Sequence, residues 1–434
     1  MCENWKNKPL REFCRFVSGS GFPENLQGMG NGELPFYKVS DMSSPGNERF
    51  LFKSNNYVSR ELARQRGWKT APVNAVAFAK VGAALLLNRR RQLSAESIID
   101  NNMVAVVANE FSTNEWLYWQ LLRVDFANFV QDGALPSINQ RQLGDIPIPR
   151  VIAAEATKIS EILDTLDTTI RETETIIAKL KAVKQGLLHD LLTRGLDENG
   201  ELRPPQSEAP HLYKDSSLGW IPRQWEQTVL ANLVNPSRPI VYGILMPGYG
   251  FPGGVPVVKV KDIKNGTISL DNLLLTSPQI DREYHRSRLI PGDLLFSIRG
   301  TVGRSAFVPN ELNGANITQD TARISILETD QRIIKYYLTM PTPSQFINTH
   351  TIGVAVKGIN LRDVRKIPMP LMPSEEAKMI ADILDGTENK IAITETQKAK
   401  YTLLKSGLMD DLLTGRVRVT SLLEAAETTV DHAP

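Results

Sequence analysis

The sequence has little of the residues that catalytic or metal-binding chains use. Its 434 residues include only two cysteines, Cys2 and Cys14, and five histidines. Two cysteines cannot form a disulfide framework, which indicates a reducing, cytoplasmic location. No histidine stands at metal-ligand spacing from another histidine or a cysteine, so we expect no metal site.

Several motifs are also absent. There is no GxxxxGK[ST] phosphate loop, no G-x-G-x-x-G opening a βαβ unit, and no Asn-Pro-Pro-aromatic motif of amino-methyltransferases. The N-terminal residues lack the apolar core of a signal peptide, and no apolar run is long enough to span a bilayer. We therefore expect no catalytic residue, no membrane partner and no cofactor bound by this chain, which favours a soluble binding protein.

What the sequence does contain is a duplication. The segment 146–195 aligns with 367–416 without a gap, at offset 221, and both copies begin with an IPxP motif. The run Asp190-Leu191-Leu192-Thr193 returns as Asp411-Leu412-Leu413-Thr414. Chance similarity rarely extends over about fifty residues, and two copies are too few for a solenoid. The sequence therefore predicts two related halves, each a globular part followed by a long helix.

The apolar positions of both copies follow alternating steps of three and four residues, which is typical of a helix that packs along a partner helix. A helix over 152–193 would be about 60 Å long, too long for one small domain to cover. We therefore expect the two helices to pair, rather than each to pack only on its own domain. Polar positions such as Thr173, Lys184 and Lys405 interrupt the pattern and are expected to set its register. The predicted seam comprises Ile159, Leu163, Leu166, Ile170, Ile177, Leu180, Ile380, Leu384, Ile391, Tyr401 and Leu408.

The positive charge lies in the two globular parts. Residues 1–150 carry 18 basic and 14 acidic residues, and residues 212–370 carry 18 and 12, whereas the whole chain is only +2. This distribution favours globular parts that face phosphates, with solvated surface charge as the alternative for part of the set. The candidate DNA contacts are Lys38, Lys80, Arg89, Arg90, Arg91, Lys259, Lys261, Arg299 and Arg304.

The globular parts are also related. Residues 35–41 match 256–262 and Ile138-Asn139 matches Ile359-Asn360 at offset 221, while Phe78 matches Phe296 at offset 218. Strands are predicted over 34–39, 73–78 and 103–107, and a helix over 115–130. The predicted divisions are a first globular domain at 1–150, a helix at 151–195, an exposed linker at 196–211, a second globular domain at 212–370, a helix at 371–416 and a tail at 417–434.

Together these motifs resemble the specificity (S) subunits of type I restriction–modification systems. The resemblance covers nearly the whole chain and includes both IPxP entries, the helix endings at 184–193 and 405–415, the LGWIP entry at 218–222 and the FSIRGTVG segment at 296–303. One departure is that the first half has Lys80-Val81-Gly82-Ala83 where the second has the RGTVG loop, so the DNA contacts of that loop cannot be transferred to it.

The resemblance implies two mixed α/β target recognition domains separated by a long antiparallel pair of coiled-coil helices with pseudo-two-fold duplication. Each domain would bind one half of a split sequence in double-stranded DNA, and the helices would set the spacer. Two modification (methyltransferase) subunits would dock on the helices, and restriction subunits would join them. S-adenosylmethionine, ATP and Mg would then bind the partner subunits. The alternatives are a coiled-coil scaffold that does not bind DNA, and a fused DNA methyltransferase or nuclease.

Overall fold

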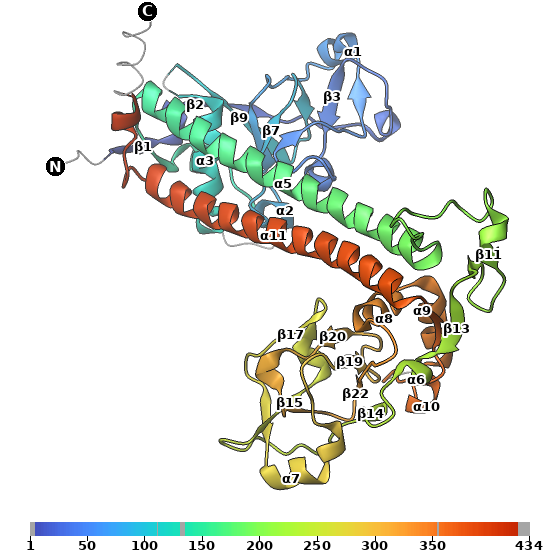
Figure 1. Cartoon of the computed structure of the whole chain (residues 1–434). Coiled ribbons are helices and arrows are strands. Elements are labelled where there is room, and N and C mark those ends of the chain that lie inside the picture. The colour runs from blue at the N-terminus through green and yellow to red at the C-terminus, as the bar shows by residue number, and fades with distance from the viewer. Residues whose placement is uncertain (1–4, 111, 131–134, 354–355, 424–434) are drawn as a thin grey trace, which may run out of the picture. The chain divides into compact units, whose positions relative to one another are not determined.

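The chain folds into two compact units, one formed by two separate segments and the other by the segment between them (Figure 1). The computed structural model describes residues 5–110, 112–130, 135–353 and 356–423. The first unit comprises Met1–Glu174 and Thr396–Pro434, and the second comprises Thr175–Glu395. Each unit therefore contains one globular head and half of each long helix. The expected mixed helix-and-sheet fold with duplicated halves is confirmed.

The head of the first unit is built around a five-stranded sheet with the order β2-β9-β6-β7-β4, next to a three-stranded sheet β5-β3-β8. The apolar strands β6 and β9 are almost fully buried at its centre, and β6 pairs antiparallel with β9. The predicted strands match β3, β6 and β9. The strands are β1 Asn7–Pro9, β2 Cys14–Ser18, β3 Leu34–Tyr37, β4 Phe50–Leu51, β5 Tyr57–Val58, β6 Val76–Ala79, β7 Arg91–Leu93, β8 Ile98–Ile99, β9 Met103–Ala108 and β10 Pro147–Pro149.

The helices of the first head are short, namely α1 Arg60–Gln65, α2 Ala83–Leu86, α3 Asn114–Arg123 and α4 Gln140–Gly144. Thr113 begins α3 by accepting a hydrogen bond from the Trp116 backbone N–H. The predicted helix over 115–130 is too long, because the backbone turns extended at Val124 and a short 3-10 turn follows.

The head of the second unit repeats this plan with a four-stranded sheet β14-β22-β19-β20 and a three-stranded sheet β18-β15-β21. Its helices are α6 Leu230–Leu233, α7 Pro278–Glu283, α8 Gln331–Tyr337, α9 Pro341–His350 and α10 Leu361–Val364. Its strands are β11 Tyr213–Lys214, β12 Ile221–Pro222, β13 Glu226–Val229, β14 Val241–Tyr242, β15 Val255–Val258, β16 Ile263–Lys264, β17 Thr267–Ile268, β18 Leu274–Thr276, β19 Leu294–Ser297, β20 Ser305–Phe307, β21 Asn316–Ile317, β22 Thr321–Ile324 and β23 Pro368–Leu371.

Both IPxP motifs form a short strand that leads into a long helix. In the first unit β10 pairs antiparallel with β1, and in the second β23 pairs antiparallel with β13. The prolines at alternate positions donate no backbone hydrogen bond, which suits a two-stranded ribbon with one free side. The start of each head is therefore tied to the start of its long helix.

The two long helices, α5 Ala153–Thr193 and α11 Ser374–Leu412, are uninterrupted and pack together. In the first unit Asp167 pairs with Lys405, and Glu174 pairs with Lys398 at 2.8 Å. Residue numbers rise along α5 as they fall along α11, so the helices are antiparallel there. Lys398 and Lys405, two polar residues on the apolar heptad positions of α11, therefore form ion pairs between the helices.

The second unit contains the matching half of this pairing. Lys181 pairs with Glu395 at 2.7 Å, and Lys184 pairs with Glu388 at 3.1 Å, again in antiparallel order. The offset that relates the two repeats converts the Lys184–Glu388 pair into the Lys405–Asp167 pair of the first unit. The duplication therefore preserves the contact between the helices as well as the helices themselves.

The predicted seam positions are all buried or half-buried. Ile159 and Leu163 lie in the core of the first unit together with Leu412 and Leu413, and Ile380 and Leu384 lie in the core of the second with Leu188 and Leu191. Ile177 and Ile391 are 8% and 7% exposed. Leu166, Ile170, Leu180, Tyr401 and Leu408 are half-buried. Each helix therefore contacts both its partner helix and the core of a head.

An aspartate at the same place in each repeat joins the helix to its head. Asp164 of α5 accepts hydrogen bonds from Arg49 at 2.6 Å and from the Trp119 indole at 3.0 Å. Asp385, the equivalent residue of α11, accepts from Tyr336 at 2.5 Å. Burial, together with hydrogen bonds to two carboxylates, raises the pKa of Tyr336 well above its usual range. Each head is therefore fixed to a helix by partly buried, charge-assisted hydrogen bonds.

A buried ion pair also closes the end of each helix pair. In the second unit Arg203 meets Glu376 at 2.6 Å, with side chains 8% and 6% exposed. In the first unit Arg418 meets Glu155 at 2.6 Å, and Glu155 is fully buried. The two glutamates are equivalent positions of the repeats, and each arginine follows the end of the opposite long helix.

The predicted linker at 196–211 is exposed at most of its positions, as expected, but it does not run free of the second unit. Leu196, Arg203 and Ala209 are buried, because the segment folds back against the rest of that unit. The tail likewise begins with an ordered part, since Val419 is buried in the core of the first unit. The rest of the predicted tail, residues 424–434, lies outside the described residues.

Candidate nucleic-acid interface

The predicted cations of the first head differ in how freely their side chains can reach a partner. Lys38, Lys80, Arg89 and Arg91 are half-buried. The Lys38 ammonium donates to the Gln27 side chain at 3.0 Å, and Arg89 donates to the Ser43 hydroxyl. Arg91 donates to the backbone oxygen of Met42 at 3.1 Å, so it also stabilises a loop of the head.

Arg90 does not belong to this set. Its side chain is fully buried, donates to the backbone oxygens of Asn88 and Val124, and lies 3.8 Å from the centre of the Phe126 ring. Burial lowers the pKa of Arg90 to about 10. The guanidinium bonds within the head and has no solvent-facing position from which to contact a phosphate. We therefore remove Arg90 from the candidate DNA contacts.

In the second head Lys261, Arg299 and Arg304 are exposed, and Lys259 is half-buried. Arg304 donates to the backbone oxygens of Val260 and Ile263 at 3.3 and 3.2 Å. These bonds hold it against the β16–β17 hairpin, where a concavity of about 400 Å³ is lined by Lys264 and Arg304. Arg304 therefore lies next to segment 259–264, which contains three lysines. Contact between Arg304 and DNA remains a prediction.

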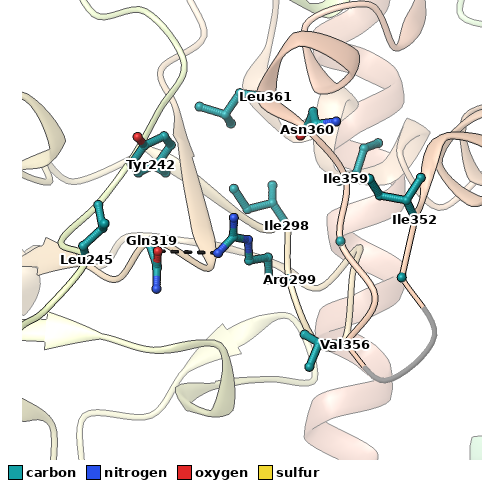
Figure 2. Close-up of a pocket in the computed structure, with 12 residues that line it drawn as sticks. Tyr242, Leu245, Ile298, Arg299, Gln319, Ile352, Val356, Ile359, Asn360 and Leu361 are labelled. Atoms are coloured by element: carbon teal, nitrogen blue, oxygen red, sulfur yellow. Dashed lines mark hydrogen bonds between the residues drawn. The ribbon is translucent and has the colours of Figure 1, made fainter.

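Arg299 lies apart from that group, on a cavity of about 610 Å³ (Figure 2). Strand β19 ends at Ser297, so Arg299 stands in the turn that the glycines of the RGTVG segment form with positive φ angles. Its guanidinium donates to the Gln319 side-chain oxygen at 3.5 Å, the long limit of a hydrogen bond. Tyr242 and Asn360 come to the same cavity from other segments.

Tyr242, Gln319 and Asn360 were not among the site residues predicted from the sequence. Tyr242 is 48% exposed at the end of a short strand, and the Gly- and Pro-rich loop that follows also exposes Met246 and Tyr249. Large apolar side chains in an exposed loop are a signal for a binding surface. The Gly- and Pro-rich composition around Met246 and Tyr249 made such a loop recognisable in the sequence. The sequence could not show that Gln319 lies beside Arg299, because the two residues belong to different segments that only the folded sheet brings together.

Among the residues that the structure describes, no group of three His, Cys, Asp or Glu side chains is placed to hold a metal ion. Within the same described ranges, no helix has both the length and the apolarity needed to cross a membrane.

Comparison with known proteins identifies the family. The family model described as "Type I restriction modification DNA specificity domain" matches residues 2–182 and 249–402, which is most of the chain. The chain belongs to this family. Members that it resembles include the EcoBI specificity subunit of Escherichia coli, 32% identical over 248 residues, covering 55% of this chain and 51% of the relative. Another is the putative MjaX specificity subunit of Methanocaldococcus jannaschii, 30% identical over 293 residues, covering 65% and 62%. These matches span about half to three-fifths of each relative's length.

Solved structures of the family share the fold. An S subunit from M. genitalium aligns with a TM-score of 0.58 at 12% identity, covering 94% of this chain and 96% of the other. A chain from a structure concerned with complex assembly and conformational transition of the type I R-M system aligns with a TM-score of 0.52 at 17% identity, covering 96% and 99%. At these identities the likeness supports the fold alone.

Proposed function

We propose that this chain is the specificity subunit of a type I restriction–modification complex, and that each head binds one half of a split sequence in double-stranded DNA. The observation that carries the proposal is the pair of related heads, each joined to one helix of an antiparallel pair. Exposed basic side chains such as Arg299, Arg304 and Lys261 supply phosphate and base contacts. In this proposal the chain selects the DNA sequence, and its partner subunits carry out the chemistry.

The helix pair is proposed to be the docking surface for two modification subunits. Val183 of α5 and Leu404 of α11 are 53% and 52% exposed although both lie on long helices. They are equivalent residues of the two repeats, and Ile176 and Ile393 are exposed on the same helices. One exposed apolar residue at an equivalent position of each helix suits two copies of one partner. S-adenosylmethionine, ATP and Mg are proposed to bind the modification and restriction subunits.

The proposal is tested by methylome sequencing of a host that expresses the modification subunits with and without this chain. A split methylated sequence that appears only with the chain supports the proposal. Methylation that is independent of the chain would favour a scaffold that does not bind DNA. Methylation or cleavage of DNA by the purified chain alone would favour the fused enzyme.

The spacer role is tested by inserting one heptad into each helix, after Glu174 and after Glu395. These positions separate the two units, so every ion pair described between the helices keeps both partners on one side of the insertions. Seven residues lengthen a helix by about 10 Å, which corresponds to about three base pairs. The expected result is a methylated sequence with a longer unspecified spacer.

The matched control inserts the heptad into α5 alone. That change shifts the charges of one helix against those of the other, so we expect reduced stability and loss of methylation. If the double insertion is stable and methylates the original spacer, the helices do not set the distance.

A further inference from the structure

The two heads make corresponding backbone contacts at the turn that carries Arg299. Arg299 forms an isolated antiparallel bridge with Gly358, and Val81 forms the corresponding bridge with Ser137 in the first head. In both heads the next residue is a glycine with positive φ, at +74° and +78°. Val81 is therefore the structural equivalent of Arg299.

A second segment matches in the same way. The Ile298 backbone N–H donates to the backbone oxygen of Asp320 at 2.8 Å, and the Lys80 backbone N–H donates to the backbone oxygen of Asn102 at 2.8 Å. The residue before each acceptor is Gln319 in the second head and Asn101 in the first.

The remaining two positions follow from similar contacts. The Ile244 N–H donates to the Ile317 oxygen at 2.7 Å, as Ser20 does to Ile99 at 2.9 Å, which makes Tyr242 equivalent to Ser18. The Ile-Asn dipeptides that match at offset 221 make Asn360 equivalent to Asn139. The second head thus has Tyr242, Arg299, Gln319 and Asn360 where the first has Ser18, Val81, Asn101 and Asn139.

The side chains of the second head hold uncommitted hydrogen-bonding groups. Among the described residues, the Arg299 side chain makes only the long bond to Gln319, which leaves most of its five N–H groups free. Asn139 caps its helix by accepting from the Gln142 N–H at 2.9 Å, whereas Asn360 begins α10 without using its side chain. Polar groups that do not serve the fold are available for a ligand.

The surroundings of these groups favour an anionic ligand. The described residues that line the cavity include Arg299 and no Asp or Glu. Lys357 and Arg362 are exposed and adjoin lining residues along the chain, and the one acid that does so directly, Asp320, is half-buried. Figure 2 shows Tyr242, Arg299, Gln319 and Asn360 around one opening.

We propose that this opening is the base-reading site of the second head, with Arg299 bound to the edge of a guanine and Gln319 or Asn360 bound to an adjacent adenine. The inference rests on the proposed function and names the residues that carry it out. An arginine fork matches the two acceptors of guanine, and a side-chain amide matches the donor and acceptor of adenine. The Val81 side chain has no hydrogen-bond donor. The first head therefore reads a different base pair, although its backbone at this turn makes the same contacts.

The test uses the full chain assembled with its modification subunits. Arg299→Val installs the residue of the first head, and Arg299→Lys keeps the charge but removes the fork. Both variants are expected to relax discrimination at one G·C position of the second half-site by about 10-fold or more in methylome sequencing. The first half-site is expected to stay unchanged. Arg286→Val, which removes an exposed arginine of the same head outside the cavity, is the matched control and should keep the native sequence preference.

The proposal is overturned if both Arg299 variants methylate the native sequence with native preference, or if the relaxed position falls in the first half-site. The proposed function would still stand in those cases, because the native complex would continue to methylate a split sequence. If Arg299→Val fails to assemble, Arg299→Lys decides between the outcomes. A native complex without any split sequence preference would instead refute the proposed function itself.

Discussion

Replacing Arg203 by methionine is predicted to destabilise the second unit strongly. Glu376 accepts two hydrogen bonds from Arg203, at 2.6 and 3.2 Å, and one from the Leu196 backbone N–H at 2.9 Å. Both charged side chains are more than nine-tenths buried. Methionine preserves most of the side-chain volume but leaves a buried carboxylate without its partner, which costs about 3–5 kcal/mol.

A double variant separates the loss of the ion pair from the loss of packing. Arg203→Met combined with Glu376→Gln removes the unpaired charge, while the glutamine oxygen still accepts from Leu196. The cost should then fall to about 1–2 kcal/mol, so the two substitutions are strongly non-additive. Lys158→Met, which breaks an exposed pair with Glu161, serves as the control and should change stability by less than about 1 kcal/mol.

Urea unfolding followed by tryptophan fluorescence measures these differences, because a fully buried tryptophan lies in each unit, Trp225 with Arg203 and Trp116 with Lys158. The reasoning is refuted if Arg203→Met costs no more than Lys158→Met. It is also refuted if the double variant costs as much as the sum of its single substitutions, since the unpaired charge would then not be the cause.

Two further predictions concern a tight glycine and a buried thiol. Gly415→Ala should lower the melting temperature, because the added Cβ would lie 2.8 Å from the Trp5 ring at a φ of +74°, whereas Gly186→Ala, with open space around it, should raise stability by about 0.5–1 kcal/mol; equal effects in thermal unfolding would contradict this. Burial raises the pKa of the Cys14 thiol to about 12, so at pH 8 only about one molecule in 10⁴ carries the thiolate, and iodoacetamide should modify Cys14 only after unfolding. Rapid alkylation of Cys14 in the native protein, measured by mass spectrometry of its peptide, would show that this account is wrong.

The fold was predictable to the extent that its signals are local or repeated. The heptad pattern predicted both long helices, because helix periodicity is a property of neighbouring residues. Alternation and β-branched content predicted β3, β6 and β9. The constant offset between the repeats predicted two related halves, and it also relates Asp164 to Asp385 and Glu155 to Glu376, which make equivalent contacts.

Only the tertiary structure decided which of several side chains that look alike in the sequence are buried and which are exposed. Arg89, Arg90 and Arg91 are indistinguishable as a run of cations, yet the packing of Phe126 and Val124 buries the middle one. Arg203 lies in a polar, proline-containing segment, but an acid in the opposite long helix draws it into the interior. Burial depends on which segments far apart in the sequence come into contact in the fold. A sequence pattern describes neighbouring residues only, so it contains no information about those tertiary contacts.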